Sequence, residues 1–101
     1  MIEMKPISVD GGTAIGIVVK LPKTTLIAIT TDIGYIMCGA LDIGLLNERL
    51  SSRNIVAGRA VGVRTLEELL EAPLESVTYE AERRGIVPGM TGVAALAKMV
   101  G

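Results

Sequence analysis

The chain has 101 residues, a net charge of −1 and a pI near 5.4, so we expect one domain spanning residues 1–101. A nucleic-acid interface needs an excess of basic residues and usually aromatic side chains for stacking, and this chain has no basic excess and only two tyrosines. We therefore expect no nucleic-acid partner. No apolar run reaches the roughly 18 residues that predict a membrane span, so we expect no membrane partner either.

Half of the residues are apolar, and nearly all of these are aliphatic. This fraction is high for a small chain, in which surface dominates volume. We expect part of the apolar surface to mediate self-association, giving a homodimer or a higher oligomer. The single cysteine excludes an internal disulfide, and the N-terminal segment lacks the apolar stretch of a signal peptide. We therefore expect the protein to be cytoplasmic.

The first two predicted elements are strands joined at an Asp-Gly turn. Residues 2–9 predict an edge strand with a bulge, because the apolar positions change parity next to Pro6. Residues 14–21 alternate between a row of bulky aliphatic residues and a row of smaller ones. This period of two is typical of a strand whose two faces differ.

Two further strands follow, at residues 24–31 and 35–41. Both are apolar on both faces, as expected of central strands that are covered on both sides. Helices are one cover, and a second subunit is a candidate for the other. Residues 32–34 predict a three-residue hairpin loop in which Gly34 adopts the left-handed conformation.

The middle of the chain predicts a helix and a fifth strand. Residues 43–52 carry a helical apolar stripe, with Asp42 as the expected N-cap. Residues 55–63 have strand character, and Gly58 and Gly62 leave one face of this strand without bulk. We expect a helix or a neighbouring subunit to pack against that face; the alternative is the floor of a ligand cleft.

The last third predicts three helices. Thr65 and Glu68 form a capping box, and Pro73 ends the helix that they open. Ser76 and Thr91 are the expected N-caps of two further helices. This order of elements predicts an α+β fold: a mixed, largely antiparallel sheet of about five strands with helices packed on one face.

Several classes of site are excluded by composition. The chain has no histidine, so it has no Ser-His-Asp triad, no Cys-His pair and no imidazole base. One cysteine without histidine makes no tetrahedral zinc site, and the glycine-rich phosphate loops are absent. We therefore expect no metal and no cofactor.

Cys38 is the candidate nucleophile. In an extended strand it shares a face with Ile36 and Ala40. No Lys, Arg or other base lies close by in the sequence to lower its pKa. Because free cysteine is among the most buried residue types, the favoured interpretation is core packing, with catalysis as the alternative.

Two arginines are candidate ligand-binding residues. Arg59 alternates with apolar residues, so its guanidinium must reach a sheet edge or a partner. Arg64 stands at a strand end directly before a capped helix, where an anion can bind. Glu67 and Glu68 lie in the first turn of that helix and compete with such an anion, so a structural ion pair is favoured over a ligand site.

Thr91 and Asp42 complete the set of candidates. Thr91 lies in "GMTG", where two glycines leave a helix start open to a carboxylate or phosphate; an ordinary cap is the favoured alternative. Asp42 ends a strand, where sites often form, but an N-cap role is favoured there as well.

Three segments carry a family resemblance: "LPKTTLIAITTDIGYIMCGALD", "AGRAVGVRTLEELLEAPLESVT" and "GIVPGMTGVAALAKM". In order and spacing they resemble the YunC family of bacterial and archaeal proteins of unknown function, and they cover most of the chain. The resemblance implies one small α+β domain per chain. It implies no activity, substrate or catalytic residue.

Two classes of function follow from the sequence. The first is a small cytosolic homo-oligomeric module that binds a small ligand or a protein partner without catalysis, and a small anion is the candidate ligand. The second is a small enzyme that uses Cys38, or an anion-binding cleft built from Arg59, Arg64 and Asp42. The lack of histidine, metal ligands and cofactor loops favours the first class.

Overall fold

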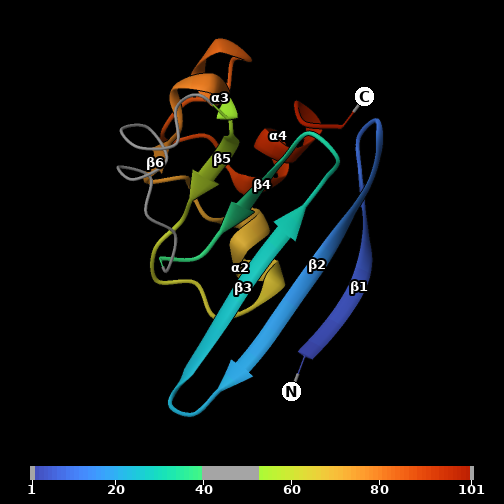
Figure 1. Cartoon of the computed structure of the whole chain (residues 1–101), viewed down its shortest axis with the longest axis vertical. Helices are drawn as coiled ribbons and strands as arrows, with labels where there is room; N and C mark the ends of the chain where they lie inside the picture. The colour runs from blue at the N-terminus through green and yellow to red at the C-terminus, as the bar shows by residue number, and fades with distance from the viewer. Residues whose placement is uncertain (1, 40–52, 101) are drawn as a thin grey trace.

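A computed structural model describes residues 2–39 and 53–100 (Figure 1). Six strands form one sheet in sequence order; every neighbouring pair is antiparallel except β4 and β5, which are parallel. The strands are β1 (Ile2–Val9), β2 (Gly12–Leu21), β3 (Thr24–Thr30), β4 (Gly34–Met37), β5 (Val56–Arg59) and β6 (Ser76–Val77). The helices are α2 (Leu66–Glu71), α3 (Tyr79–Arg83) and α4 (Gly92–Ala97).

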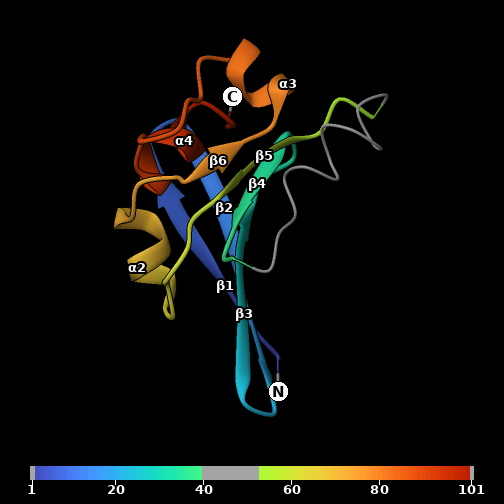
Figure 2. The ribbon, with the colours of Figure 1, turned by 90° about the vertical axis from the view of Figure 1, so that its left-hand side faces the viewer.

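The α+β class and the mixed, largely antiparallel sheet are confirmed. Figure 2 shows α2 and α4 on one side of the sheet and α3 beyond its upper end next to β5, with the β2–β3 hairpin extending past the helices at the lower end. The predicted helix at residues 43–52 and its cap Asp42 lie outside the described residues. No helix within residues 2–39 and 53–100 is long and apolar enough to cross a bilayer.

The core lies between the sheet and the helices. Alternate positions of the strands point toward the helical layer, because successive side chains of a strand lie on opposite faces. Small residues on this side of the sheet receive leucines: a Cβ on Gly16 would lie 2.8 Å from Leu66, and a Cβ on Gly58 would lie 2.8 Å from Leu74. The largest fully buried side chains are Ile27, Ile29, Ile36, Leu69, Leu74, Ile86, Leu96 and Met99.

The capping box that opens α2 is confirmed. The Thr65 hydroxyl accepts from the backbone N–H of Glu68, and the Glu68 carboxylate accepts from the backbone N–H of Thr65. The helix ends with Ala72 as its C-cap, directly before Pro73. These local signals are short-range, which is why the sequence alone locates this helix.

The predicted bulge in the first strand is wrong. β1 pairs with β2 in continuous register from Ile2 opposite Val19 to Val9 opposite Gly12. The change of parity at Pro6 instead places apolar residues on both faces of one regular strand. Ile7 and Val9 pack toward the core, whereas Ile2 and Met4 point away from it.

The predicted role of Gly34 is also wrong. The turn at residues 31–33 is held by the Thr31 hydroxyl, which accepts from the backbone N–H groups of Ile33 and Gly34. Gly34 is not among the glycines with positive φ. Glycine is required here because β4 and β5 approach closely: a Cβ on Gly34 would clash with the carbonyl oxygen of Val56 on β5.

Ser76 does not cap a helix. Ser76 and Val77 form β6, and Thr78 is the N-cap of α3, with its hydroxyl accepting from the backbone N–H of Ala81. Pairing with β5 extends the chain for two residues before the helix begins. A two-residue strand has no periodicity of its own, so the sequence did not indicate it.

Candidate functional site

The sheet has an apolar face that no described helix covers. Residues directly opposite each other in neighbouring strands lie on the same face, so the register identifies its members. We call this surface the open face. It is formed by Ile2, Met4, Ile15, Ile17, Val19, Leu21, Leu26 and Ala28 of β1–β3, and it continues on β4 with Tyr35 and Met37.

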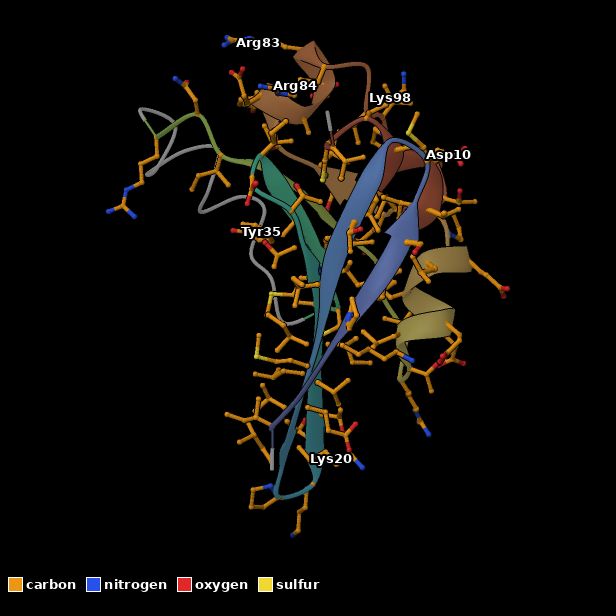
Figure 3. All side chains as sticks on the ribbon, turned by 90° about the vertical axis from the view of Figure 1, so that its right-hand side faces the viewer. Asp10, Lys20, Tyr35, Arg83, Arg84 and Lys98 are labelled. Atoms are coloured by element: carbon orange, nitrogen blue, oxygen red, sulfur yellow. The ribbon has the colours of Figure 1, made fainter. Side chains whose placement is uncertain are left out.

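The open face carries no charged side chain on strands β1–β4. The remaining positions on this side are Pro6, Ser8, Thr13, Thr24 and Thr30. Figure 3 shows Tyr35 pointing to the side of the sheet away from α2. Exposure is high at the edge of the face, with Ile2 and Met4 both 67% exposed and Leu21 47% exposed.

The charges of β1–β3 lie on the opposite side, which is the side of the helices. Glu3 and Lys20 approach each other to 3.9 Å, and Lys5 lies 3.6 Å from the Glu67 carboxylate on α2. In a two-layer fold the uncovered face of a sheet is ordinarily the polar one. On β1–β3 that distribution is reversed, because the helix-covered side carries the charges.

Cys38 lies in the core. It is 6% exposed, follows Ile36 on the helix-facing side of the sheet, and donates its backbone N–H to the carbonyl of Ile27. Within the described residues no cluster of histidine, cysteine or acidic side chains forms that would hold a metal.

Arg59 is engaged in structural contacts. Its guanidinium donates to the Glu75 carboxylate at 2.8 Å and to the Gly39 carbonyl at 3.1 Å, and its side chain is 31% exposed. Glu75 directly precedes β6, the strand that pairs with β5. The partner that Arg59 required therefore comes from the neighbouring strand of the sheet.

Arg64 lies apart from Arg59. It lines two clefts, and Arg59 lines neither of them. The predicted ion pair of Arg64 is wrong for the described residues, because both local acids are occupied. Glu67 pairs with Lys5, and the Glu68 carboxylate accepts from the backbone N–H groups of Arg64 and Thr65.

Thr91 is the N-cap of α4, and its hydroxyl accepts from the backbone N–H of Ala94. The start of this helix packs against α2: Gly92 donates its N–H to the carbonyl of Ala72, and a Cβ on Gly92 would lie 2.2 Å from the Leu69 carbonyl oxygen. Glycine thus permits a close helix contact here. Asp42 lies outside the described residues.

Sequence reasoning missed the charge-free open face and the role of Lys23. The signal for the face was present, since the bulky row of residues 15–21 contains no charge. What the sequence lacked was the side on which the helices pack. Lys23 carries no motif that would mark it in the sequence, although it lines a cleft together with Arg64.

These features define the class of protein: a small α+β domain with one helix-covered sheet face and one face that is apolar on β1–β4 and carries Arg59 on β5. A family model described as "Domain of unknown function (DUF1805)" matches residues 37–99, and the chain belongs to this family.

Two known proteins are similar over nearly the whole chain. "Uncharacterized protein YunC" from Bacillus subtilis (strain 168) is 59% identical over 100 residues, which are 99% of this chain and 99% of that protein. The crystal structure of a protein of unknown function, TA1206 from Thermoplasma acidophilum, superimposes with a TM-score of 0.87 at 28% identity. That match covers 98% of this chain and 93% of the other. The resemblance to the YunC family is confirmed.

Proposed function

We propose that this protein is a self-associating module of the cytoplasm that binds a small ligand or a protein partner without catalysis, and that its subunits pack through the open face. The observation that carries self-association is the absence of charge from the open face of β1–β4, while the charges of the same strands lie on the other side. A charge-free aliphatic surface of this kind typically marks an interaction site.

A second copy of the chain is the proposed occupant of the open face. The four strands, about 4.8 Å apart and on average roughly 24 Å long, give a projected area of roughly 500 Å² per copy. Two such faces bury on the order of 1,000 Å², which is near the lower limit for a specific interface. Sheets of β-branched and aliphatic residues also pack face to face at about 10 Å separation, as in β-sandwiches.

Pairing along the edge of the sheet is a less suitable mode. β1 is the long edge strand, and Pro6 within it has no N–H to donate to a further strand. Glu3 and Lys5 add charges to the same edge, which is how natural proteins limit edge-to-edge association. The face therefore fits a second copy better than the edge does.

The test is the oligomeric state of two lysine variants, measured by light scattering and sedimentation. Met4→Lys places a charge on the open face at a side chain that is 67% exposed, so the fold of the subunit is retained. Val93→Lys is the matched control, because Val93 is 45% exposed but belongs to α4 on the other side. We expect the wild type and Val93→Lys to be dimers or larger at micromolar concentration, and Met4→Lys to be a monomer.

Two results would overturn the proposal. One is a wild-type chain that stays monomeric across the micromolar range. The other is an oligomer that tolerates Met4→Lys and Val93→Lys equally well. An oligomer lost in Ser8→Pro, which removes an N–H from the outer edge of β1, but unchanged by Met4→Lys, would assign association to the β1 edge instead.

A further inference from the structure

A second surface of the molecule lies where the β2–β3 turn meets the segment that leads into α2. Here an open cleft of about 520 Å³ is lined by Lys23, Thr24, Thr25, Val63 and Arg64. Thr25 pairs with Lys20 in the sheet, which places both on the side of the helices. Figure 3 shows Lys20 near this end of the sheet, far from Arg83 and Arg84 at the opposite end of the molecule.

The cleft is positively charged. Its two charged residues, Lys23 and Arg64, are both basic and exposed, and neither side chain has an ion-pair or hydrogen-bond partner within residues 2–39 and 53–100. Four of the other seven basic residues in the described part of the chain have acidic partners: Lys5, Lys20, Arg59 and Arg83. Two unpaired cations thus share one cleft that has no acidic lining residue.

The acids near Arg64 are held elsewhere by the fold. The Glu67 carboxylate forms an ion pair with the Lys5 ammonium. The Glu68 carboxylate accepts hydrogen bonds from the backbone N–H groups of Arg64 and Thr65. The local competition that the sequence suggested for an anion is thereby removed. The guanidinium of Arg64 is left as a free planar donor, the geometry that binds phosphate oxygens in pairs.

Lys23 occupies its position against its backbone preference. Its φ is +62°, a conformation that glycine or asparagine adopts at lower energy. The turn has only two residues between paired Leu21 and Thr24, with Pro22 fixing the first and Lys23 taking the left-handed second place. A strained residue that also supplies a charge to a cleft is an indication of function.

We propose that this cleft binds the phosphate group of a small phosphorylated molecule. The inference rests on the ligand-binding part of the proposed function and gives it a site. Arg64 contributes the fork of donors, Lys23 a point charge, and Thr25, on the side of the helices, a hydroxyl group suited to a remaining oxygen. The volume leaves room for the organic part of the ligand beyond its phosphate. Two cations match a doubly charged phosphate better than a singly charged carboxylate.

The experiment is a titration of the full chain with inorganic phosphate, followed by amide chemical shifts at constant ionic strength. We expect saturable shifts at residues 23–25 and 63–65, with a dissociation constant on the order of millimolar for so small a probe. Arg64→Gln and Lys23→Gly are each expected to raise this constant at least about fivefold. Lys23→Gly keeps the turn, because glycine prefers positive φ.

The matched control is Arg84→Gln, which removes an arginine from the C-cap of α3, at the opposite end of the molecule from the cleft, and is expected to leave the dissociation constant unchanged within about twofold. Equal weakening by Arg84→Gln and Arg64→Gln, or no saturable shift at the cleft, would overturn the site. Acetate that binds as tightly as phosphate would overturn the choice of ligand.

Failure of this inference is separable from failure of self-association. Met4 does not line the cleft, which meets the open face only at Thr24. We expect the Met4→Lys monomer to bind inorganic phosphate as the wild type does. Loss of phosphate binding in that well-folded monomer would contradict a site contained within one subunit.

Discussion

The two faces of the sheet are built from the same strands but have opposite chemistry. Toward the helices, β2 presents Ala14 and Gly16, and the space above them is filled by helix side chains such as Leu66. Away from the helices, the same strand presents Ile15 and Ile17, and the described residues place no helix over them. The lesson is that bulk alone does not identify the core face of a strand. The helices pack on the small residues because the leucine side chains need space there, and the described helices leave the bulky row uncovered.

The largest expected effect comes from cutting side chains on the helix-covered face. Ile36→Ala removes a fully buried side chain from the core and leaves a cavity, so we expect a loss of about 2–5 kcal/mol in the free energy of unfolding. Urea denaturation measures this loss. It should be the same at every protein concentration, because the cavity lies within one subunit.

Ile17→Ala is the matched substitution on the open face. In dilute solution, where the chain is a monomer, we expect it to cost about 1 kcal/mol or less, since Ile17 is only partly buried in the subunit. At higher concentration the cost should grow, because a residue of the interface stabilises the oligomer by mass action. A cost as large as that of Ile36→Ala and independent of concentration would erase the contrast between the faces.

The next prediction compares the rate at which a thiol reagent labels a cysteine on each face of the sheet. Native Cys38 is expected to react with a thiol reagent at least about 100-fold more slowly than in urea, because reaction at a core thiol requires opening of the structure. Leu21→Cys in a Cys38→Ala background provides the open-face comparison, and at concentrations below dimerisation it should react close to the rate of a free thiol. Rapid labelling of native Cys38 would favour the enzymatic alternative over core packing.

The smallest effect concerns the charges beside the helical layer. The backbone N–H of Glu67 and the Lys5 ammonium hold the pKa of the Glu67 carboxyl below its ordinary value of 4.5. A lowered folded-state pKa means that the charged form stabilises the fold above pH 4.5 and that this contribution is lost as the pH falls through the lowered pKa. We expect Glu67→Gln to lower the Tm by about 1–2 °C at neutral pH, since an exposed pair contributes little.

Thermal unfolding across the acid range tests the sign. The difference between Glu67→Gln and the wild type should vanish once the pH is well below 4.5. Lys5→Met should show a smaller deficit with the same direction of pH dependence, because it removes only part of what lowers the pKa. A deficit that persists unchanged into acid would assign the effect of Glu67 to packing instead of charge.

Much of the fold was predictable because its signals are local. The capping box of Thr65 and Glu68, the cap at Thr91 and the alternation in β2 each depend on neighbours within a few residues. The role of Gly34 was missed because its need is set by Val56, which is 22 positions later in the chain. The strand at Ser76 was missed because two residues gain strand geometry only by pairing with β5.

The candidate site divides in the same way. Arg59 required a partner by composition alone, but that the partner is Glu75 follows from the pairing of β5 with β6. Arg64 was expected to pair with a nearby acid. In the structure Glu67 pairs with Lys5, and the Glu68 carboxylate accepts from backbone N–H groups. Its approach to Lys23, 41 positions earlier, required the hairpin to reach the segment before α2.

By itself the sequence determined the α+β class, the helix caps at Thr65 and Thr91, the aliphatic excess and the membership of a family, because propensity, capping and composition act over short distances. Only the tertiary structure decided which face of each strand is covered, where the charges gather and which cations remain unpaired. The physical reason is that the alternation of side chains along a strand defines two faces but does not say which of them is buried. The helices pack against the face whose small residues leave space for their side chains. This fit depends on contacts between segments that are distant in the chain.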